Sequence, residues 1–215
     1  MNLAAIEQAA AAHRLFVSGA FHPGPGDAAP AGTGTLVLLS PAEPGFWPHV
    51  TASPEFADGA RNPLDRWSAR VVDALAQVFG ATALLPFGGP PWHPFYAWAL
   101  RSGAAWRSPV SLLVHERMGL WASYRGALAL PDVLTLPEPP GNPCSGCPAP
   151  CTSACPVAAL DAQGYKVAAC HGFLDSTAGT GCLSFGCAVR RTCPVSAAYG
   201  RLAEQSAWHM RQFHK

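Results

Sequence analysis

All eight cysteines of this 215-residue chain lie between Cys144 and Cys193. They form two runs. The first run reads Cys144-Ser-Gly-Cys147-Pro-Ala-Pro-Cys151-Thr-Ser-Ala-Cys155-Pro156, and the second contains Cys170, Cys182, Cys187 and Cys193, the last followed by Pro194. Cysteines gathered in this way are joined to one another or bound to a metal. This segment therefore constrains the fold more than any other part of the chain.

Disulfides and zinc sites are two interpretations of such a segment. Disulfides persist in oxidising compartments, but the N-terminus lacks the basic region of a signal peptide, and Glu7 and His13 interrupt any apolar stretch behind it. We therefore expect a cytoplasmic protein without disulfides. Zinc ribbons and fingers bind through Cys-x2-Cys pairs, and only Cys144 and Cys147 form such a pair. Zinc also leaves the Cys-Pro ending of both runs unexplained.

Iron–sulfur clusters are the third interpretation. Two cubane clusters need eight thiolates, four each, and the chain supplies eight with none left over. A Cys-Pro ending, separated from the preceding cysteine by three residues, closes the ligand run of bacterial ferredoxins, and that last cysteine binds the other cluster. The first run has two, three and three residues between its cysteines, where ferredoxins have two, two and three. The sequence predicts two [4Fe-4S] clusters and electron transfer, while the wider spacings leave the cluster type open.

Composition limits the partners and the location of the chain. Apolar residues make up 49% and charged residues 13%, so the chain can bury a sizeable core. The formal charge of +1 gives no reason to expect a nucleic acid or an anionic membrane as partner. No apolar run approaches the roughly 20 residues needed to span a bilayer.

Hydrophobic periodicity predicts a mixed α/β (α+β) domain in the first part of the chain. Five prolines between Pro131 and Pro143 indicate a boundary, so we expect an α/β domain over residues 1–135 and a cysteine module with a C-terminal helix over residues 144–215. The expected helices are 2–13, 63–79 (capped by Asn62 and ended by Gly80), 95–102 and 196–214 (capped by Ser196), and the expected strands are 15–21, 35–40 and 81–87. Residues 111–115 and 120–130 are expected to pair as a hairpin.

A loop of glycine and proline, Gly88–Pro94, follows the expected strand 81–87 directly, where open α/β sheets place ligand loops. His93 in this loop is a candidate proton donor or metal ligand, and Trp92 a candidate stacking partner for a flat cofactor. His171, directly after Cys170, is a candidate hydrogen-bond donor to cluster sulfur. Each of the three has a structural alternative: local packing for His93 and Trp92, and ordinary exposure for His171.

With these residues in view, the chain resembles a short member of the epoxyqueuosine reductase family and of the related cobalamin-dependent reductive dehalogenases. The resemblance covers roughly residues 60–195. It rests on the order and spacing of Leu85-Pro-Phe87, Arg101-Ser-Gly103 with Trp106, Ser111-Leu-Leu-Val, Gly126-Ala-Leu-Ala-Leu-Pro131, both cysteine runs and Tyr165-Lys-Val-Ala-Ala-Cys170.

The resemblance implies a particular fold and two ligand sets. It implies an α/β domain like those of flavin reductases and cobalamin-processing proteins, followed by a ferredoxin-like module with two clusters. The first set would be Cys144, Cys147, Cys151 and Cys193, and the second set would be Cys155, Cys170, Cys182 and Cys187. Each cluster then ties the beginning of the segment to its end, so cluster loss is expected to unfold the module.

The resemblance also implies a function. Electrons would pass through the clusters to a cofactor or substrate on the α/β domain, with cobalamin favoured over flavin, and Gly89, Trp92, His93 and Trp106 would face that cofactor. Epoxyqueuosine reductases carry an aspartate proton donor where this chain has Gly88-Gly89, and glycine cannot donate a proton. We therefore expect, if an enzyme, a reductase that reduces or handles cobalamin, with a redox partner protein as electron donor. The alternative is a ferredoxin-like carrier that docks on a partner enzyme and catalyses nothing itself.

Overall fold

The computed structural model describes residues 2–215 and divides them into two compact units. The first unit contains the chain up to Ala104 together with Ser123–Pro140, and the second contains Ala105–Ala122 and Gly141–Lys215. The sequence expectation placed residues 105–122 in the first domain. The structure groups them with the cysteine segment, because apolar side chains of this insertion pack against it, as Val110 and Leu120 do against Cys151.

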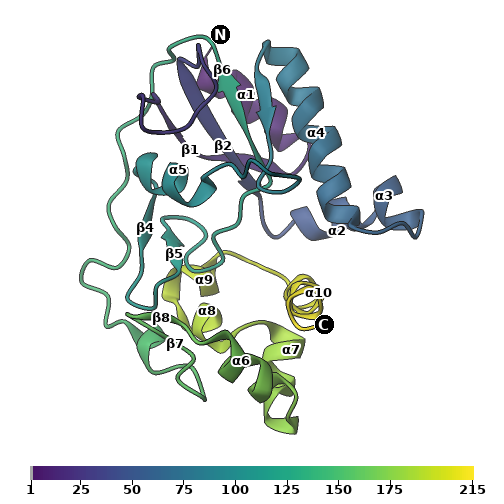
Figure 1. Cartoon of the computed structure of the whole chain (residues 1–215), viewed down its shortest axis with the longest axis vertical. Helices are drawn as coiled ribbons and strands as arrows, with labels where there is room; N and C mark the ends of the chain where they lie inside the picture. The colour runs from purple at the N-terminus through teal and green to yellow at the C-terminus, as the bar shows by residue number, and fades with distance from the viewer. Residues whose placement is uncertain (1) are drawn as a thin grey trace. The chain divides into compact units, whose positions relative to one another are not determined.

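A four-stranded antiparallel sheet forms the centre of the first unit (Figure 1). Its strands are β1 (Leu15–Phe21), β2 (Thr35–Pro41), β6 (Gly126–Leu130) and β3 (Thr82–Leu84), in that order across the sheet. Every residue of β2 and β6 is buried, as expected for central strands covered on both faces. The predicted mixed α/β class is confirmed, but the antiparallel order removes the argument that placed a ligand loop after β3, which holds for open parallel sheets.

Two helices cover one face of this sheet. Helix α1 (Leu3–Ala11) contacts β1 and α4, and helix α4 (Pro63–Phe79) contacts β3 and β6 (Figure 1). The apolar side chains that recur along α4, among them Trp67, Val71 and Leu75, are buried, and Gly80 ends the helix in the left-handed conformation. Asn62 precedes the helix but makes no capping hydrogen bond through its side chain. The helix begins instead at Pro63, whose fixed φ suits the first turn.

Helix α5 (Phe95–Arg101) is followed by a turn that packs against β1. A Cβ atom on Gly19 of β1 would stand 2.5 Å from the Ser102 hydroxyl oxygen, so the glycine permits this close approach. The Trp98 indole N–H donates to the Asp27 carbonyl at 2.6 Å and fixes the helix to the loop between β1 and β2.

The expected hairpin of residues 111–115 with 120–130 is wrong. Strand β5 (Leu113–His115) pairs with β4 (Ala105–Arg107), and β6 pairs with β2 and β3 in the other unit. Only an isolated bridge joins His115 to Gly119. The wholly apolar β6 gains more burial between two long-range partners than beside its neighbour in sequence, and a local pattern does not reveal such partners.

Much of the proline-rich segment 131–143 belongs to the first unit. The Leu134 backbone N–H donates to the Thr35 hydroxyl at 2.9 Å, and its carbonyl accepts a hydrogen bond from His22 at 2.9 Å. Leu134 itself is buried. The boundary between the units therefore lies after Pro140 rather than at residue 135.

The second unit consists of short elements. Besides β4 and β5 they are η1 (Pro150–Thr152), β7 (Leu160–Asp161), β8 (Gly164–Tyr165), α6 (Val167–Leu174), η2 (Thr177–Gly179), α7 (Thr180–Phe185), α8 (Ala188–Thr192), α9 (Pro194–Ala198) and α10 (Ala203–Phe213). The single C-terminal helix expected over 196–214 is two helices, because Gly200 adopts a left-handed φ of 80° between them. Within residues 2–215, no helix is long and apolar enough to cross a membrane.

Two short helices, α2 (Phe46–Thr51) and α3 (Pro54–Ala57), lie between β2 and α4. Glu55 on α3 is buried and forms an ion pair with Arg70 of α4 through two hydrogen bonds, one of them 3.1 Å long. The hydrogen bond from Arg70 lowers the pKa of Glu55 from its ordinary value of 4.5 to about 2. The pair therefore stabilises the first unit above pH 4.5, and this contribution disappears as the pH falls toward 2.

Replacing Glu55 with Gln is expected to lower the free energy of unfolding of the first unit at pH 7 by about 1 kcal/mol, since Arg70 is half exposed and water screens the pair. The difference from the unmodified protein should shrink as the pH falls from 4.5 toward 2. Hydrogen exchange of the α4 amides, compared between the two proteins at each pH, measures it. Glu7→Gln on exposed α1 is the control and should change nothing; a pH-independent difference for Glu55→Gln would contradict the assignment.

Candidate metal centre

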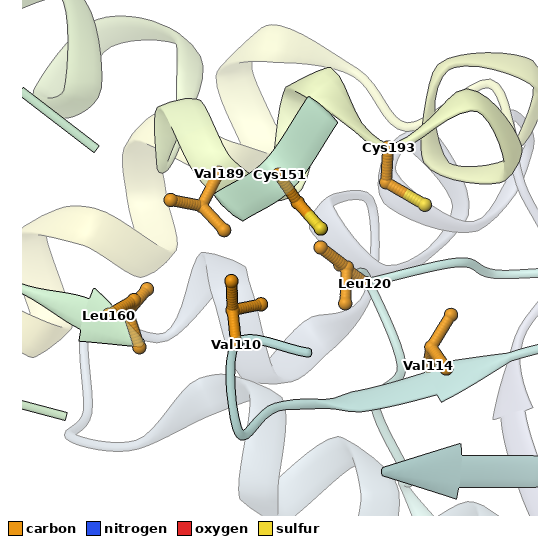
Figure 2. Packing of buried hydrophobic residues seen from close by; sticks show 7 residues of the cluster. All are labelled: Val110, Val114, Leu120, Cys151, Leu160, Val189 and Cys193. Carbon is orange, nitrogen blue, oxygen red and sulfur yellow. The ribbon is translucent and has the colours of Figure 1, made fainter. Parts of the chain in front are cut away.

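An apolar cluster in the second unit carries two of the cysteines. Val110, Val114, Leu120, Leu160 and Val189 are buried together with Cys151 and Cys193. Figure 2 shows the Cys151 sulfur pointing toward Leu120, below the short helical turn that holds the cysteine. Residues from four separate stretches of chain thus enclose one end of the cysteine segment.

A cavity adjoins this cluster and is lined by four cysteines. They are Cys144, Cys147, Cys151 and Cys193, the first set of the sequence analysis, accompanied by Ser108, Pro109, Val114, Leu120, Pro143, Ala149, Pro150, Pro194 and Val195. Apart from the thiols, the lining is almost entirely apolar. Three of the four cysteines come from the first run and the fourth closes the second run, so the cavity brings together residues that stand far apart in the sequence.

Turns aim the first-run cysteines at this cavity. The Cys144 backbone N–H donates to the Asn142 side chain at 2.9 Å, and the Cys147 N–H donates to the Cys144 carbonyl at 3.2 Å. Ala149 takes a left-handed φ of 50° before the 3-10 turn that carries Cys151. Cys193 is extended and precedes Pro194, the first residue of α9. Proline suits a first helical position because it has no N–H to leave unpaired.

The thiols of this set affect one another. Burial raises the pKa of Cys144, and the neighbouring Cys147, Cys151 and Cys193 raise it further. Burial likewise raises the pKa of Cys151, with a further contribution from Cys193. Without a cation between them, thiolates here would repel one another in apolar surroundings. A cationic core bound in the cavity would reverse that effect.

The second set is held by different elements. Cys170 lies on α6, Cys182 on α7 and Cys187 directly before α8, while Cys155 follows η1. Cys155 and Cys187 both pack against the apolar cluster. Burial raises the pKa of Cys187, and Cys182 adds to the effect. The Cys155 sulfur accepts a hydrogen bond from the Ala159 N–H at 3.2 Å.

Tyr165 and Arg190 lie among the second set, and sequence reasoning gave Tyr165 no role. The Tyr165 side chain interacts with Cys170, and burial together with this interaction raises the pKa of Tyr165. The Arg190 guanidinium donates to the Leu120 carbonyl and interacts electrostatically with Cys187 and Tyr165. Burial lowers the pKa of Arg190, yet a guanidinium stays charged at neutral pH. A positive charge at this position offsets negative charge on the neighbouring Cys187 thiolate.

His171 does not use its Nδ1 atom as a donor to cysteine sulfur. This atom lies 2.8 Å from Nδ1 of His214, whose Nε2 lies 3.0 Å from Asp175, and the His171 ring also packs on Phe213. The position directly after Cys170 on a helix directs the ring toward the C-terminus of α10 instead.

The candidate cofactor residues fall in both units. Gly89, Trp92 and His93 lie on the loop after β3 in the first unit, where His93 stacks on Trp98 with ring centroids 5.5 Å apart. Trp92 is 67% exposed, which leaves its ring face accessible. Trp106 lies on β4 of the second unit and packs, half-buried, against the apolar cluster. The expectation that all four face one cofactor remains a prediction.

Among the described residues, no three His, Cys, Asp or Glu side chains are placed to bind one metal ion. A [4Fe-4S] cubane requires a wider arrangement of ligands than a single metal ion does. Each of its four thiolates binds a different iron atom, so the cysteine sulfur atoms stand further apart.

Ser196 and Gly119 each stand next in sequence to a residue that lines the cavity, Val195 and Leu120. The sequence indicated Ser196 as a helix cap, but it is buried and its hydroxyl accepts a hydrogen bond from the Leu120 N–H at 2.7 Å. Gly119 adopts a φ of 56°, and a Cβ atom there would stand 2.4 Å from the Ser196 nitrogen. The only sequence signal for this role of Ser196 was a serine within an amphipathic pattern. A serine in such a pattern also fits a helix cap, so the contact with Leu120 was missed.

Replacing Gly119 with Ala is expected to lower the free energy of unfolding by about 3 kcal/mol, from backbone strain and overpacking together. Gly146→Ala is a matched control, because its φ is 75° and a Cβ atom there meets nothing within 4 Å; strain alone should cost about 1 kcal/mol. Denaturant unfolding of the reconstituted protein measures both. Equal losses in the two variants would contradict the close packing of Gly119 on Ser196.

Comparisons of the chain with protein-family models, with curated proteins and with solved structures find no match.

Proposed function

We propose that this chain is an iron–sulfur redox protein that passes electrons through two [4Fe-4S] clusters to a cofactor or substrate on the first unit. The observation that carries the proposal is the cavity lined by Cys144, Cys147, Cys151 and Cys193. The ligand set implied by the family resemblance consists of these four residues. Two-cluster ferredoxins bind their clusters through a crossed pairing of this kind.

The donor set and its surroundings fit the group. Four thiols meet in an apolar cavity, and thiolates are the ligands that iron–sulfur clusters use. Their mutual repulsion disfavours the metal-free thiolate form. Cys155, Cys170, Cys182 and Cys187 would hold the second cluster. When bound, such clusters take up and release single electrons at potentials set by net charge, hydrogen bonds to sulfur and exposure.

The residues of this chain supply those influences. Tyr165 interacts with Cys170, and a hydrogen bond from its hydroxyl to the sulfur would stabilise the more negative, reduced state of the second cluster. Arg190 brings a positive charge beside Cys187 and favours the same state. Val114, Leu120 and Val195 line the first site with apolar surface, which would limit the access of water to a bound cluster. Each of these effects acts on potential rather than on bond making.

The acceptor of the electrons is proposed to be cobalamin, bound at the first unit beside the loop of Trp92 and His93. The exposed Trp92 ring supports this, since a flat macrocycle can stack on it. The fold would then be a cobalamin-processing type of α/β unit followed by a ferredoxin-like module. With Gly88-Gly89 in place of an acid, the loop offers His93 as its one titratable side chain.

Anaerobic reconstitution with iron and sulfide, followed by addition of hydroxocobalamin, tests the proposal. We expect broad visible absorption that bleaches on reduction, and a change in the cobalamin spectrum that is absent in Trp92→Ala. Clusters without cobalamin binding would favour the ferredoxin-like carrier that docks on a partner enzyme. A protein that forms no cluster would overturn both.

A further inference from the structure

An exposed aromatic patch lies on the second unit. It consists of Tyr165 at the end of β8, Val167 at the start of α6 and Phe213 at the end of α10. These side chains are 39%, 44% and 37% exposed. The Tyr165 and Phe213 rings are stacked, with centroids 6.0 Å apart and planes 17° from parallel. Large apolar side chains gathered at the surface mark a site of contact with another molecule.

The patch is in direct contact with the second cysteine set. Tyr165 interacts electrostatically with Cys170, and the Phe213 ring lies 4.6 Å from that of His171, the residue directly after Cys170 on α6. A molecule resting on this patch is therefore one side chain away from a proposed cluster ligand. The first cysteine set, by contrast, lines a cavity whose walls include the buried side chains of Val114 and Leu120.

Basic residues surround the patch. Lys166 stands between Tyr165 and Val167 in the sequence, and Arg211 and Lys215 flank Phe213. Lys166 pairs with Asp161 at 2.7 Å, whereas Arg211 and Lys215 are exposed. Asp161 offsets the charge of Lys166, and Asp175 lies 3.0 Å from His214, so the net positive charge beside the patch comes from Arg211 and Lys215. The partner whose charge complements this surface is acidic.

We propose that the patch of Tyr165, Val167 and Phe213 is the docking site of an acidic one-electron carrier protein that reduces the second cluster. The inference rests on the proposed function. In the step, one electron leaves the reduced carrier and enters the oxidised cluster; no atom is transferred. The apolar centre makes the contact, and the basic rim steers the encounter, as opposite charges do for transient redox partners.

The test uses the reconstituted full chain and a reduced plant-type [2Fe-2S] ferredoxin as the acidic carrier, with cluster absorbance followed by stopped flow. Phe213→Ala and the double variant Arg211→Glu/Lys215→Glu should each lower the second-order rate constant about tenfold at low salt. For the charge variant, the difference should shrink as ionic strength rises. Reduction by photoreduced 5-deazaflavin, a small uncharged reductant, should be unchanged.

Matched controls lie on the first unit. Val78→Ala removes a side chain that is 72% exposed on α4, and Arg61→Glu reverses an exposed charge; both should leave the rate unchanged. Patch variants that react with ferredoxin like the unmodified protein would overturn the docking site. The docking site would also be overturned if deazaflavin reduced the clusters of this chain and ferredoxin did not. A chain without reducible clusters would instead overturn the proposed function.

Discussion

The double variant Cys151→Ser/Cys193→Ser is expected to keep about half of its iron after reconstitution, whereas Cys151→Ser/Cys155→Ser should lose nearly all of it. Both variants remove two thiols. In the crossed pairing the first variant damages one cluster and the second damages both, because Cys151 and Cys193 line one cavity and Cys155 belongs to the other set. Iron content and the electron paramagnetic resonance signal of the reduced protein measure the outcome.

Thr192→Ser is the control beside Cys193, because serine can keep the hydrogen bond that the Thr192 hydroxyl donates to the Ala188 carbonyl. It should retain full iron. If each run of the sequence held its own cluster, the pattern would reverse: Cys151→Ser/Cys155→Ser would keep half of the iron and Cys151→Ser/Cys193→Ser would lose it. That reversal would contradict the crossed pairing.

Removal of both clusters is expected to unfold the second unit and leave the first one folded. The helices of the cysteine segment are 5 to 11 residues long, and helices this short are marginal without tertiary support. Free energy of metal binding, on the order of 10 kcal/mol for structural metal sites, is then free energy of folding. The first unit has its own buried strands, β2 and β6.

Hydrogen exchange under anaerobic conditions, before and after iron is removed with a chelator, measures this effect. Amides of α6, α7 and α10 should lose protection, while those of β2 and β6 keep it. A sample carried through the same steps without the chelator is the control. Equal protection of α7 with and without iron would show that packing alone holds the unit.

Strong local patterns allowed much of the first unit to be predicted. Trp67, Val71 and Leu75 recur at helical spacing and Gly80 provides the stop, so α4 appears where expected. The almost wholly apolar run at residues 35–40 lies in β2, every residue of which is buried. The partners of β6 and the placement of β4 and β5 depend on burial against distant segments, which no local pattern encodes.

In the cysteine segment, the sequence showed which side chains could bind clusters, but it did not show which other side chains surround them. The thiols were evident from the sequence, and the structure gathers four of them around one cavity. The contacts of Tyr165 with Cys170, of Arg190 with Leu120 and of Ser196 with Leu120 join residues that are separated in the sequence or carry no distinctive spacing. Side chains of this kind are recognised only when the fold has brought them together.

Quantification of iron, acid-labile sulfide and zinc in protein purified without oxygen tests the central claim most directly. Two [4Fe-4S] clusters require about eight iron atoms and about eight sulfides in each chain, and no zinc. A chain that carries about two zinc ions and neither iron nor sulfide would contradict the account.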